Sequence, residues 1–232
     1  MKNRIIVALD EVGSIRVLLS LAERLSPYVG GFKIGAHIDR YGVSAIRALK
    51  KFGIVMSDLK VYDIPSSAAR RVKEHVDAGA DFVTVNAAGG RNMLKACAYV
   101  APTQLIAVTV LTSWNEVDTL RMFGRTMPQM VKWLARLASK NGAVGIVCAP
   151  RDLITVAEIQ LPDLIKITPN VRPSWFPMNS DQNASRTMTP QDALLHGANY
   201  VVIGRPIISA QNPEHAAGRI LQDIEQEFET PY

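Results

Sequence analysis

Apolar residues follow two different patterns along this chain. Short apolar runs rich in β-branched residues predict β-strands, whereas stretches with an apolar residue at every third or fourth position predict amphipathic helices. Eight strands are expected, at residues 4–9, 31–34, 54–59, 82–85, 104–110, 144–148, 164–168 and 200–203. Helices are expected at residues 14–25, 44–51, 67–78, 92–98, 127–139, 151–157, 190–196 and 213–227. Strands that alternate with helices in this way predict a closed parallel (β/α)8 TIM barrel.

The length and the composition agree with one α/β domain covering residues 1–232. Hydrophobic residues make up 48% of the chain and charged residues 20%, which suits one large core and is too apolar for a disordered chain. The formal net charge is +5, but the charges are scattered, so a nucleic-acid partner is not expected. A positive potential would favour a small anionic substrate.

The two cysteines, Cys97 and Cys148, lie in apolar segments and lack the spacing of metal ligands. The sequence leaves a disulfide between them open, but buried free thiols fit their surroundings better. The chain contains no run of about eighteen apolar residues, so no membrane partner is expected. A reducing cytoplasm is the expected compartment.

The segment DLKVYD, at the end of the third expected strand, places Asp58, Lys60 and Asp63 close together in sequence. In an extended strand Asp58 and Lys60 would point to the same side, because side chains alternate with a period of two. Three charges are costly to bury, so the motif taken alone fits a solvated strand end as well as a functional site.

Charges at neighbouring strand ends favour the functional interpretation. Asp10 ends the first expected strand and Lys33 lies in the second, and both would project toward the barrel mouth that holds Asp58 and Lys60. Lysines interleaved with carboxylates compensate one another's charge. The sequence therefore predicts one mixed-charge cluster at the carboxyl ends of the first three strands.

Two later segments predict a ligand-binding region at the same mouth. Gly204 and Arg205 follow the eighth expected strand, where barrels frequently bind phosphate through backbone N–H groups and a basic side chain. The long patternless segment 170–187 follows the seventh strand and is expected to form a substrate lid.

Several motifs together resemble one enzyme family. DLKVYDIP is similar to the Asp-x-Lys-x-x-Asp-Ile-Pro signature of orotidine 5′-phosphate decarboxylases, and VALD, GFKIG, TVLTS, ITPNVRP, DQNASRTMTP and VVIGRPI follow the family's order. The resemblance implies conversion of orotidine 5′-monophosphate to uridine 5′-monophosphate and carbon dioxide without a metal or an organic cofactor. It departs from the family pattern at Ser66, Ser67 and Asn86 and in the less glycine-rich opening of the lid.

The resemblance also implies roles for the charged cluster. Lys60 would stabilise the carbanion that forms at pyrimidine C6 and deliver a proton to it. Asp58 would hold Lys60 and crowd the departing carboxylate, and Lys33 would complete the network. Asp63 would enter the site of a neighbouring subunit, so a homodimer is expected. Asp10 would bind ribose hydroxyls.

Contacts to the rest of the substrate follow from the same resemblance. Thr112 or Ser113 would hydrogen-bond the pyrimidine, and Pro169 is placed among the substrate-binding residues. The phosphate would meet Arg205, the backbone of Gly204, and Gln182 of the lid; the residues implied in substrate binding are thus Asp10, Thr112, Ser113, Pro169, Gln182, Gly204 and Arg205.

Two other interpretations stay open. Magnesium-dependent relatives, such as 3-keto-gulonate-phosphate decarboxylase and hexulose-phosphate synthase, resemble this motif, but they tend to carry a glutamate ligand where this chain has Lys33. A catalytically silent barrel that binds a nucleotide is the second alternative, because a fold does not by itself define an activity. The complete set of Lys33, Asp58, Lys60 and Asp63 argues against a silent barrel.

Overall fold

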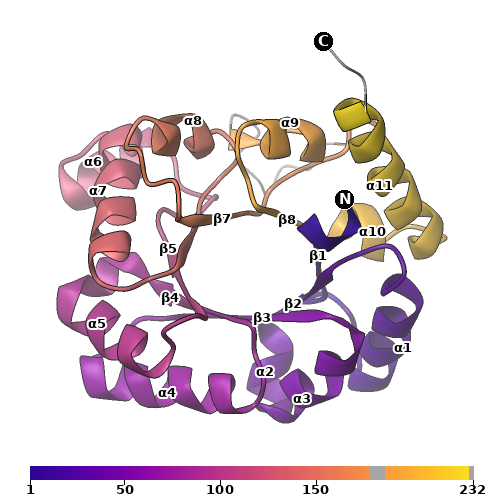
Figure 1. Ribbon diagram of the computed structural model, residues 1–232, viewed down its shortest axis with the longest axis horizontal. Coiled ribbons are helices and arrows are strands. Elements are labelled where there is room, and N and C mark those ends of the chain that lie inside the picture. Colours follow the sequence, from indigo (N-terminus) through magenta and orange to yellow (C-terminus); the bar gives the residue numbers. More distant parts are fainter. Residues whose placement is uncertain (178–185, 230–232) are drawn as a thin grey trace.

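The computed structural model describes residues 1–177 and 186–229, and its strands form a closed barrel in chain order (Figure 1). The strands are β1 (Ile5–Ala8), β2 (Gly31–Ile34), β3 (Ile54–Val61), β4 (Phe82–Asn86), β5 (Leu105–Val108), β6 (Gly145–Val147), β7 (Ile165–Thr168) and β8 (Tyr200–Ile203). Each strand pairs in parallel with the next, and β8 closes the ring by pairing with β1. The predicted TIM barrel is confirmed.

Helices surround this barrel on the outside (Figure 1). They are α1 (Ile15–Leu25), α2 (Ala36–Tyr41), α3 (Ser44–Leu49), α4 (Pro65–Asp77), α5 (Gly90–Val100), α6 (Glu116–Phe123), α7 (Met127–Lys140), α8 (Asp152–Ala157), α9 (Pro190–Leu195), α10 (Arg205–Ile208) and α11 (Pro213–Glu229). Short 3-10 helices occur at Lys2–Arg4, Lys50–Phe52 and Ala87–Gly89. The helices α2, α6 and α10 were not predicted from the sequence.

The helix α6 could not be predicted from the apolar pattern, because its large apolar side chains do not form one buried face. Val117, Leu120 and Met122 are exposed, and Thr119 is the residue of the helix that is buried. The start of α6 is nevertheless encoded locally, by a capping box between Asn115 and the backbone and side chain of residue 118.

Alternating side chains divide the strands into an inner and an outer layer. Inside the barrel, side chains such as Ile6, Met56 and Ile106 form a small apolar cluster. Their sequence neighbours face outward and pack against the helices in the larger core. Farther along the inward-facing positions, polar and charged side chains replace apolar ones, so the apolar floor of the barrel supports a polar mouth.

Both cysteines are buried and free, which resolves the alternative left open by the sequence. Burial raises the pKa of Cys97 to about 11 and that of Cys148 to about 12, so both thiols are protonated at neutral pH. Among the helices of residues 1–177 and 186–229, none is long and apolar enough to cross a membrane.

Gly31 occupies a position on β2 where there is no room for a side chain. A Cβ atom there would lie 2.2 Å from the Ile54 carbonyl oxygen of β3. The absence of a side chain therefore allows the first residues of β2 and β3 to approach each other and close the barrel floor.

Replacing Gly31 with alanine should therefore destabilise the barrel. We expect Gly31→Ala to lower the free energy of unfolding by about 1–3 kcal/mol, because backbone must shift to admit the methyl group. Gly13→Ala is the matched control, since a Cβ at Gly13 would have no atom within 4 Å. Urea unfolding followed by circular dichroism measures both, and equal stability of the two variants would contradict the steric argument.

Candidate active site

Inward-facing positions at the ends of β1, β2 and β3 bring Asp10, Lys33 and Asp58 together. Lys33 pairs in register with Ala8 of β1, two residues before Asp10. The Nζ atom of Lys33 donates to Asp10 Oδ2 and, at 3.0 Å, to Asp58 Oδ2. The second Asp10 oxygen accepts from the backbone N–H of Gly35 at 2.7 Å. The mixed-charge cluster expected from the sequence is therefore present.

Lys60 joins this cluster through the same carboxylate. Its Nζ donates to Asp58 Oδ2 at 2.6 Å, so two ammonium groups share one oxygen atom. The Lys60 side chain is 43% exposed, whereas those of Asp58 and Lys33 are 8% and 13% exposed. Lys60 thus presents the solvent-facing ammonium of the network, while Lys33 and Asp58 are its buried members.

The charges of the network stabilise one another's ionised forms. Burial alone would raise the pKa of Asp58, but Lys33 and Lys60 outweigh it and lower that pKa to about 2. Burial alone would lower the pKa of Lys33, but Asp58 and Asp10 outweigh it and raise that pKa above its ordinary value. At neutral pH the site therefore holds an anion and a cation side by side in a largely buried position.

The end of β3 is irregular, which the period-two argument did not anticipate. The pairing of β3 with β4 changes register between Ser57 and Val61. Within this bulge Lys60 has a φ of 48°, an uncommon conformation for a residue other than glycine. Asp58 and Lys60 do meet, as expected, but they do so in a bulge instead of a regular strand.

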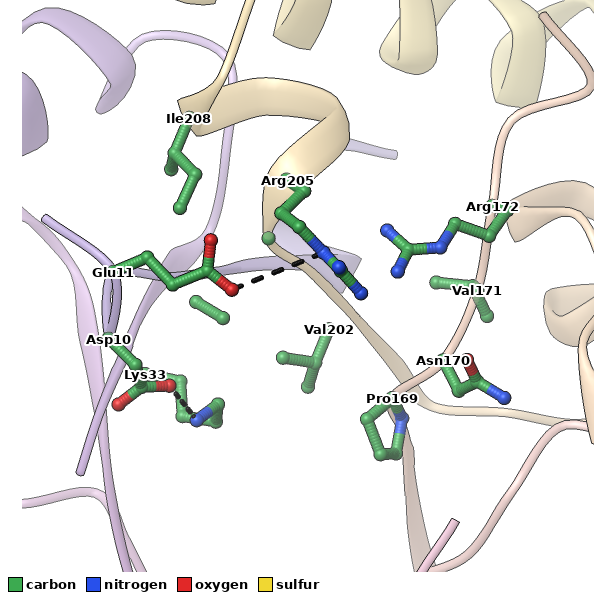
Figure 2. Close-up of a pocket in the computed structure, with 12 residues that line it drawn as sticks. Asp10, Glu11, Lys33, Pro169, Asn170, Val171, Arg172, Val202, Arg205 and Ile208 are labelled. Carbon is green, nitrogen blue, oxygen red and sulfur yellow. Dashed lines mark hydrogen bonds and ion pairs between the residues drawn. The ribbon is translucent and has the colours of Figure 1, made fainter. Parts of the chain in front are cut away.

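A cavity of about 220 Å³ lies beside the network, at the ends of β1, β7 and β8. Gly204 and Arg205 line it, as does Pro169, so these three predicted residues lie together. Figure 2 shows the Arg205 side chain in this cavity, with the Glu11 carboxylate 4.0 Å from its Nε. Asp10 also lines the cavity.

Arg172 is a second arginine in this cavity and was not predicted from the sequence. Its guanidinium approaches that of Arg205 in Figure 2, and its residue is only 7% exposed. The group also lies over the Phe176 ring, 5.5 Å from the centroid. Two converging guanidinium groups form a site for a doubly charged anion such as a phosphate group. The Arg-Pro pair in the segment after β7 was the available sequence signal.

A second cavity, of about 290 Å³, lies on the other side of Lys33. Asp58, Lys60, Asp10 and Lys33 line it. Asp10 and Lys33 also line the first cavity, here called the arginine cavity after Arg172 and Arg205, so these two residues form a wall between the two cavities. A ligand that spans this wall could place an anionic group at the arginines and a reacting group at Lys60.

Other predicted residues are less directly placed. Asp63 is exposed just beyond β3, and its carboxylate accepts from the backbone N–H of Ile64 at 2.7 Å. Thr112 and Ser113 lie in the connection between β5 and α6, outside the linings of the two cavities that adjoin Lys33. Gln182 lies outside the described residues.

Arg186 holds the connection between β5 and α6, a role that the sequence pattern did not reveal. Its Nη1 donates to the carbonyl oxygens of Leu111 at 2.7 Å and Trp114 at 3.2 Å. Its Nη2 pairs with Asp152 at 2.5 Å, and both of these side chains are almost fully buried. The backbone on either side of Thr112 and Ser113 is thereby tied to α8.

Asn86, a departure from the family pattern, has a local structural role. Its side-chain Oδ1 accepts from the backbone N–H of Ala88 at 3.0 Å and caps the 3-10 helix that follows β4. Within residues 1–177 and 186–229, no group of three or more histidine, cysteine or acidic residues could hold a metal ion. The Lys33 ammonium also lies between Asp10 and Asp58, where a divalent cation would be repelled.

Comparison with known families identifies the group to which this site belongs. The sequence model described as the "Orotidine 5′-phosphate decarboxylase / HUMPS family" matches residues 3–220. The chain belongs to this family. The family name covers more than one group of enzymes, so the individual relatives and the chemistry of the site narrow the assignment.

Relatives named orotidine 5′-phosphate decarboxylase match nearly the whole chain. The protein of Paramagnetospirillum magneticum is 37% identical over 237 residues, covering 97% of this chain and 99% of its own. That of Moorella thermoacetica is 39% identical over 240 residues, covering 97% and 93%. The solved structure of the Lactobacillus acidophilus enzyme of this name superposes with a TM-score of 0.78 at 29% identity, covering 97% and 99%.

The lowered pKa of Asp58 predicts a pH dependence of stability. Its ionised form stabilises the folded state, so this contribution is fully present above the unfolded pKa and is lost as the pH falls through the folded pKa of about 2. We expect the stability advantage of the wild type over Asp58→Asn to shrink by about 2 kcal/mol between about pH 5 and about pH 2.

Urea unfolding at a series of pH values measures this difference. Asp77→Asn is the control, because Asp77 forms an exposed ion pair with Lys73 that contributes little to stability. An advantage over Asp58→Asn that stays constant down to about pH 2 would contradict the electrostatic account of the network.

Proposed function

We propose that this protein converts orotidine 5′-monophosphate to uridine 5′-monophosphate and carbon dioxide in pyrimidine biosynthesis. The relatives named orotidine 5′-phosphate decarboxylase, which match nearly the whole chain, support the assignment. The observation that carries it is the position of Lys60, whose partly exposed ammonium is held by the buried Asp58 carboxylate at 2.6 Å. This arrangement provides a proton donor next to a fixed negative charge, which the reaction requires.

Decarboxylation breaks the bond between pyrimidine C6 and the carboxyl carbon. The electron pair of that bond stays on C6, carbon dioxide leaves, and C6 then takes a proton. The ammonium of Lys60 stabilises the developing negative charge and donates this proton. Asp58, itself held by Lys33, keeps Lys60 in place. The Asp58 carboxylate repels the carboxylate of the bound substrate, and this repulsion is absent once carbon dioxide has left.

The phosphate serves as a binding handle. Arg205 and Arg172 bind it in the cavity at β7 and β8. The sequence resemblance adds Gln182, which lies outside the described residues. Asp10, on the wall between the two cavities, binds the ribose hydroxyls. Binding energy from the phosphate, far from C6, offsets the cost of bringing the substrate carboxylate near Asp58.

The magnesium-dependent reaction is a weaker candidate. The Lys33 ammonium occupies the place between the Asp10 and Asp58 carboxylates, where a magnesium ion would need oxygen ligands. A silent binding protein is also disfavoured, because a binder of anions gains nothing from a carboxylate beside its ligand.

We infer a homodimer in which Asp63 serves the partner's site. Asp63 lies outside its own charge network and is flanked by Tyr62 and Ile64, which are 67% and 65% exposed. Large apolar side chains so exposed at the barrel mouth suit an interface. We place this enzyme in the cytoplasm, with the whole chain acting as one domain and without a nucleic-acid or membrane partner.

Activity measurements on two variants separate chemistry from binding. With chelator present, we expect the wild type to convert orotidine 5′-monophosphate, followed by the absorbance change of the pyrimidine. Lys60→Ala should abolish turnover but still bind uridine 5′-monophosphate, because Lys60 acts on C6. Arg205→Ala should mainly raise KM, because it removes a phosphate contact.

Lys95→Ala, on the exposed side of α5, is the control and should behave as wild type. A wild type that turns over only with added magnesium would overturn the proposal. Equal losses of binding and turnover in both variants would contradict the assigned roles.

Mixing two variants, each of which we expect to be inactive by itself, tests the shared site. In a mixed dimer of Lys60→Ala and Asp63→Ala subunits, one site would combine both changes and the other would have neither. Activity should therefore return on mixing, to about a quarter of the wild-type level after random exchange of subunits. If Asp63 served its own subunit, every site would carry one change and the mixture would remain inactive.

A further inference from the structure

Thr84 is a fully buried polar residue in the middle of β4, and its hydroxyl contacts two members of the charge network. The Oγ1 atom lies 2.9 Å from Asp58 Oδ1 and 2.9 Å from the backbone nitrogen of Lys60. Its neighbours in β4, Val83 and Val85, are apolar and equally buried. The hydroxyl therefore connects the carboxylate of one residue in the β3 bulge with the backbone of another.

The directions of these two hydrogen bonds are fixed by chemistry. The backbone N–H of Lys60 can only donate, so the Thr84 oxygen accepts from it. The ionised carboxylate of Asp58 can only accept, so the single Thr84 proton is donated to it. One side-chain hydroxyl thus uses its donor and one acceptor position at once.

The bulge explains why such a partner is needed. Four residue steps on β3, from Ser57 to Val61, are matched by two steps on β4, from Val83 to Val85. The intervening residues of β3 cannot all pair with the backbone of β4, and the Lys60 N–H would lose its partner there. Thr84 lies at the midpoint of the shorter β4 segment and supplies the missing acceptor.

The same hydroxyl limits the rotation of the Asp58 carboxylate. Both ammonium groups contact Oδ2, at 3.0 Å from Lys33 and 2.6 Å from Lys60. The contact from Thr84 is to the other oxygen, Oδ1, so β4 holds one end of the carboxylate and the lysines of β2 and β3 hold the other. With contacts to Oδ2 alone, the carboxylate could rotate about its Cβ–Cγ bond.

We propose that Thr84 is a positioning residue for the decarboxylation, which sets the place of the Lys60 ammonium through the Lys60 backbone and the Asp58 carboxylate. This inference rests on the proposed function. Thr84 contributes no group to either cavity beside Lys33, so its effect should fall on turnover and not on nucleotide binding.

Thr84→Val tests this role, because valine keeps the shape and removes both hydrogen bonds. We expect kcat to fall about 10- to 100-fold, since misplaced reacting groups cost this much. The KM and the Kd for uridine 5′-monophosphate should stay close to wild type. Thr84→Ser, which keeps the hydroxyl, should restore most of kcat.

Thr119→Val is the matched control. Thr119 is also fully buried, but its hydroxyl donates to the Glu116 carbonyl within α6. It should keep wild-type kcat, and melting temperatures of all variants show whether they are folded. A wild-type kcat in Thr84→Val would overturn the proposal, as would an equal loss in Thr84→Ser or a parallel loss of nucleotide binding.

A crystal structure of Thr84→Val decides the point independently of activity. We expect a rotated Asp58 carboxylate and a displaced Lys60 backbone; unchanged positions of both would overturn the positioning role. A wild type that does not decarboxylate orotidine 5′-monophosphate would contradict the proposed function alone, and the structure of the variant would still test the placement of Asp58 and Lys60 by Thr84.

Discussion

The carboxylate of Asp58 lies in the barrel mouth with little access to water, where an unpaired charge would cost several kcal/mol. Two lysines and one threonine hydroxyl satisfy it, and each comes from a different place: Lys33 from β2, Lys60 from the bulge of β3, and Thr84 from β4. The contacts to this one group therefore link the ends of three neighbouring strands, which the barrel already pairs with one another. The ammonium of Lys60 is held in place through the same carboxylate.

A negative charge fixed in this way repels a substrate carboxylate, so productive binding must be driven from elsewhere. In the proposed function the cavity lined by Arg172 and Arg205 supplies that drive. This cavity and the one lined by Asp58 and Lys60 have Asp10 and Lys33 in common. Separation of the handle from the reacting carbon allows binding energy to offset repulsion at Asp58. The closed barrel holds both regions in a fixed relation.

Much of this could be predicted from the sequence, since parallel strand ends must meet at one mouth. That rule brought Asp10, Lys33 and Asp58 together without knowledge of contacts. The β3 bulge and the role of Thr84 could not be predicted, because they depend on the register between two strands, which no local pattern encodes. Arg172 and Arg186 both lie in the patternless segment 170–187. The helix α6 was missed because its large apolar residues are exposed and give no amphipathic pattern.

The central claim is that the network aims the Lys60 ammonium at the carbon that loses carbon dioxide. A crystal structure with bound uridine 5′-monophosphate tests this directly. The account predicts the Lys60 Nζ within about 3.5 Å of pyrimidine C6, with the phosphate between Arg172 and Arg205. A pyrimidine bound away from Lys60, with C6 facing another side chain, would contradict it.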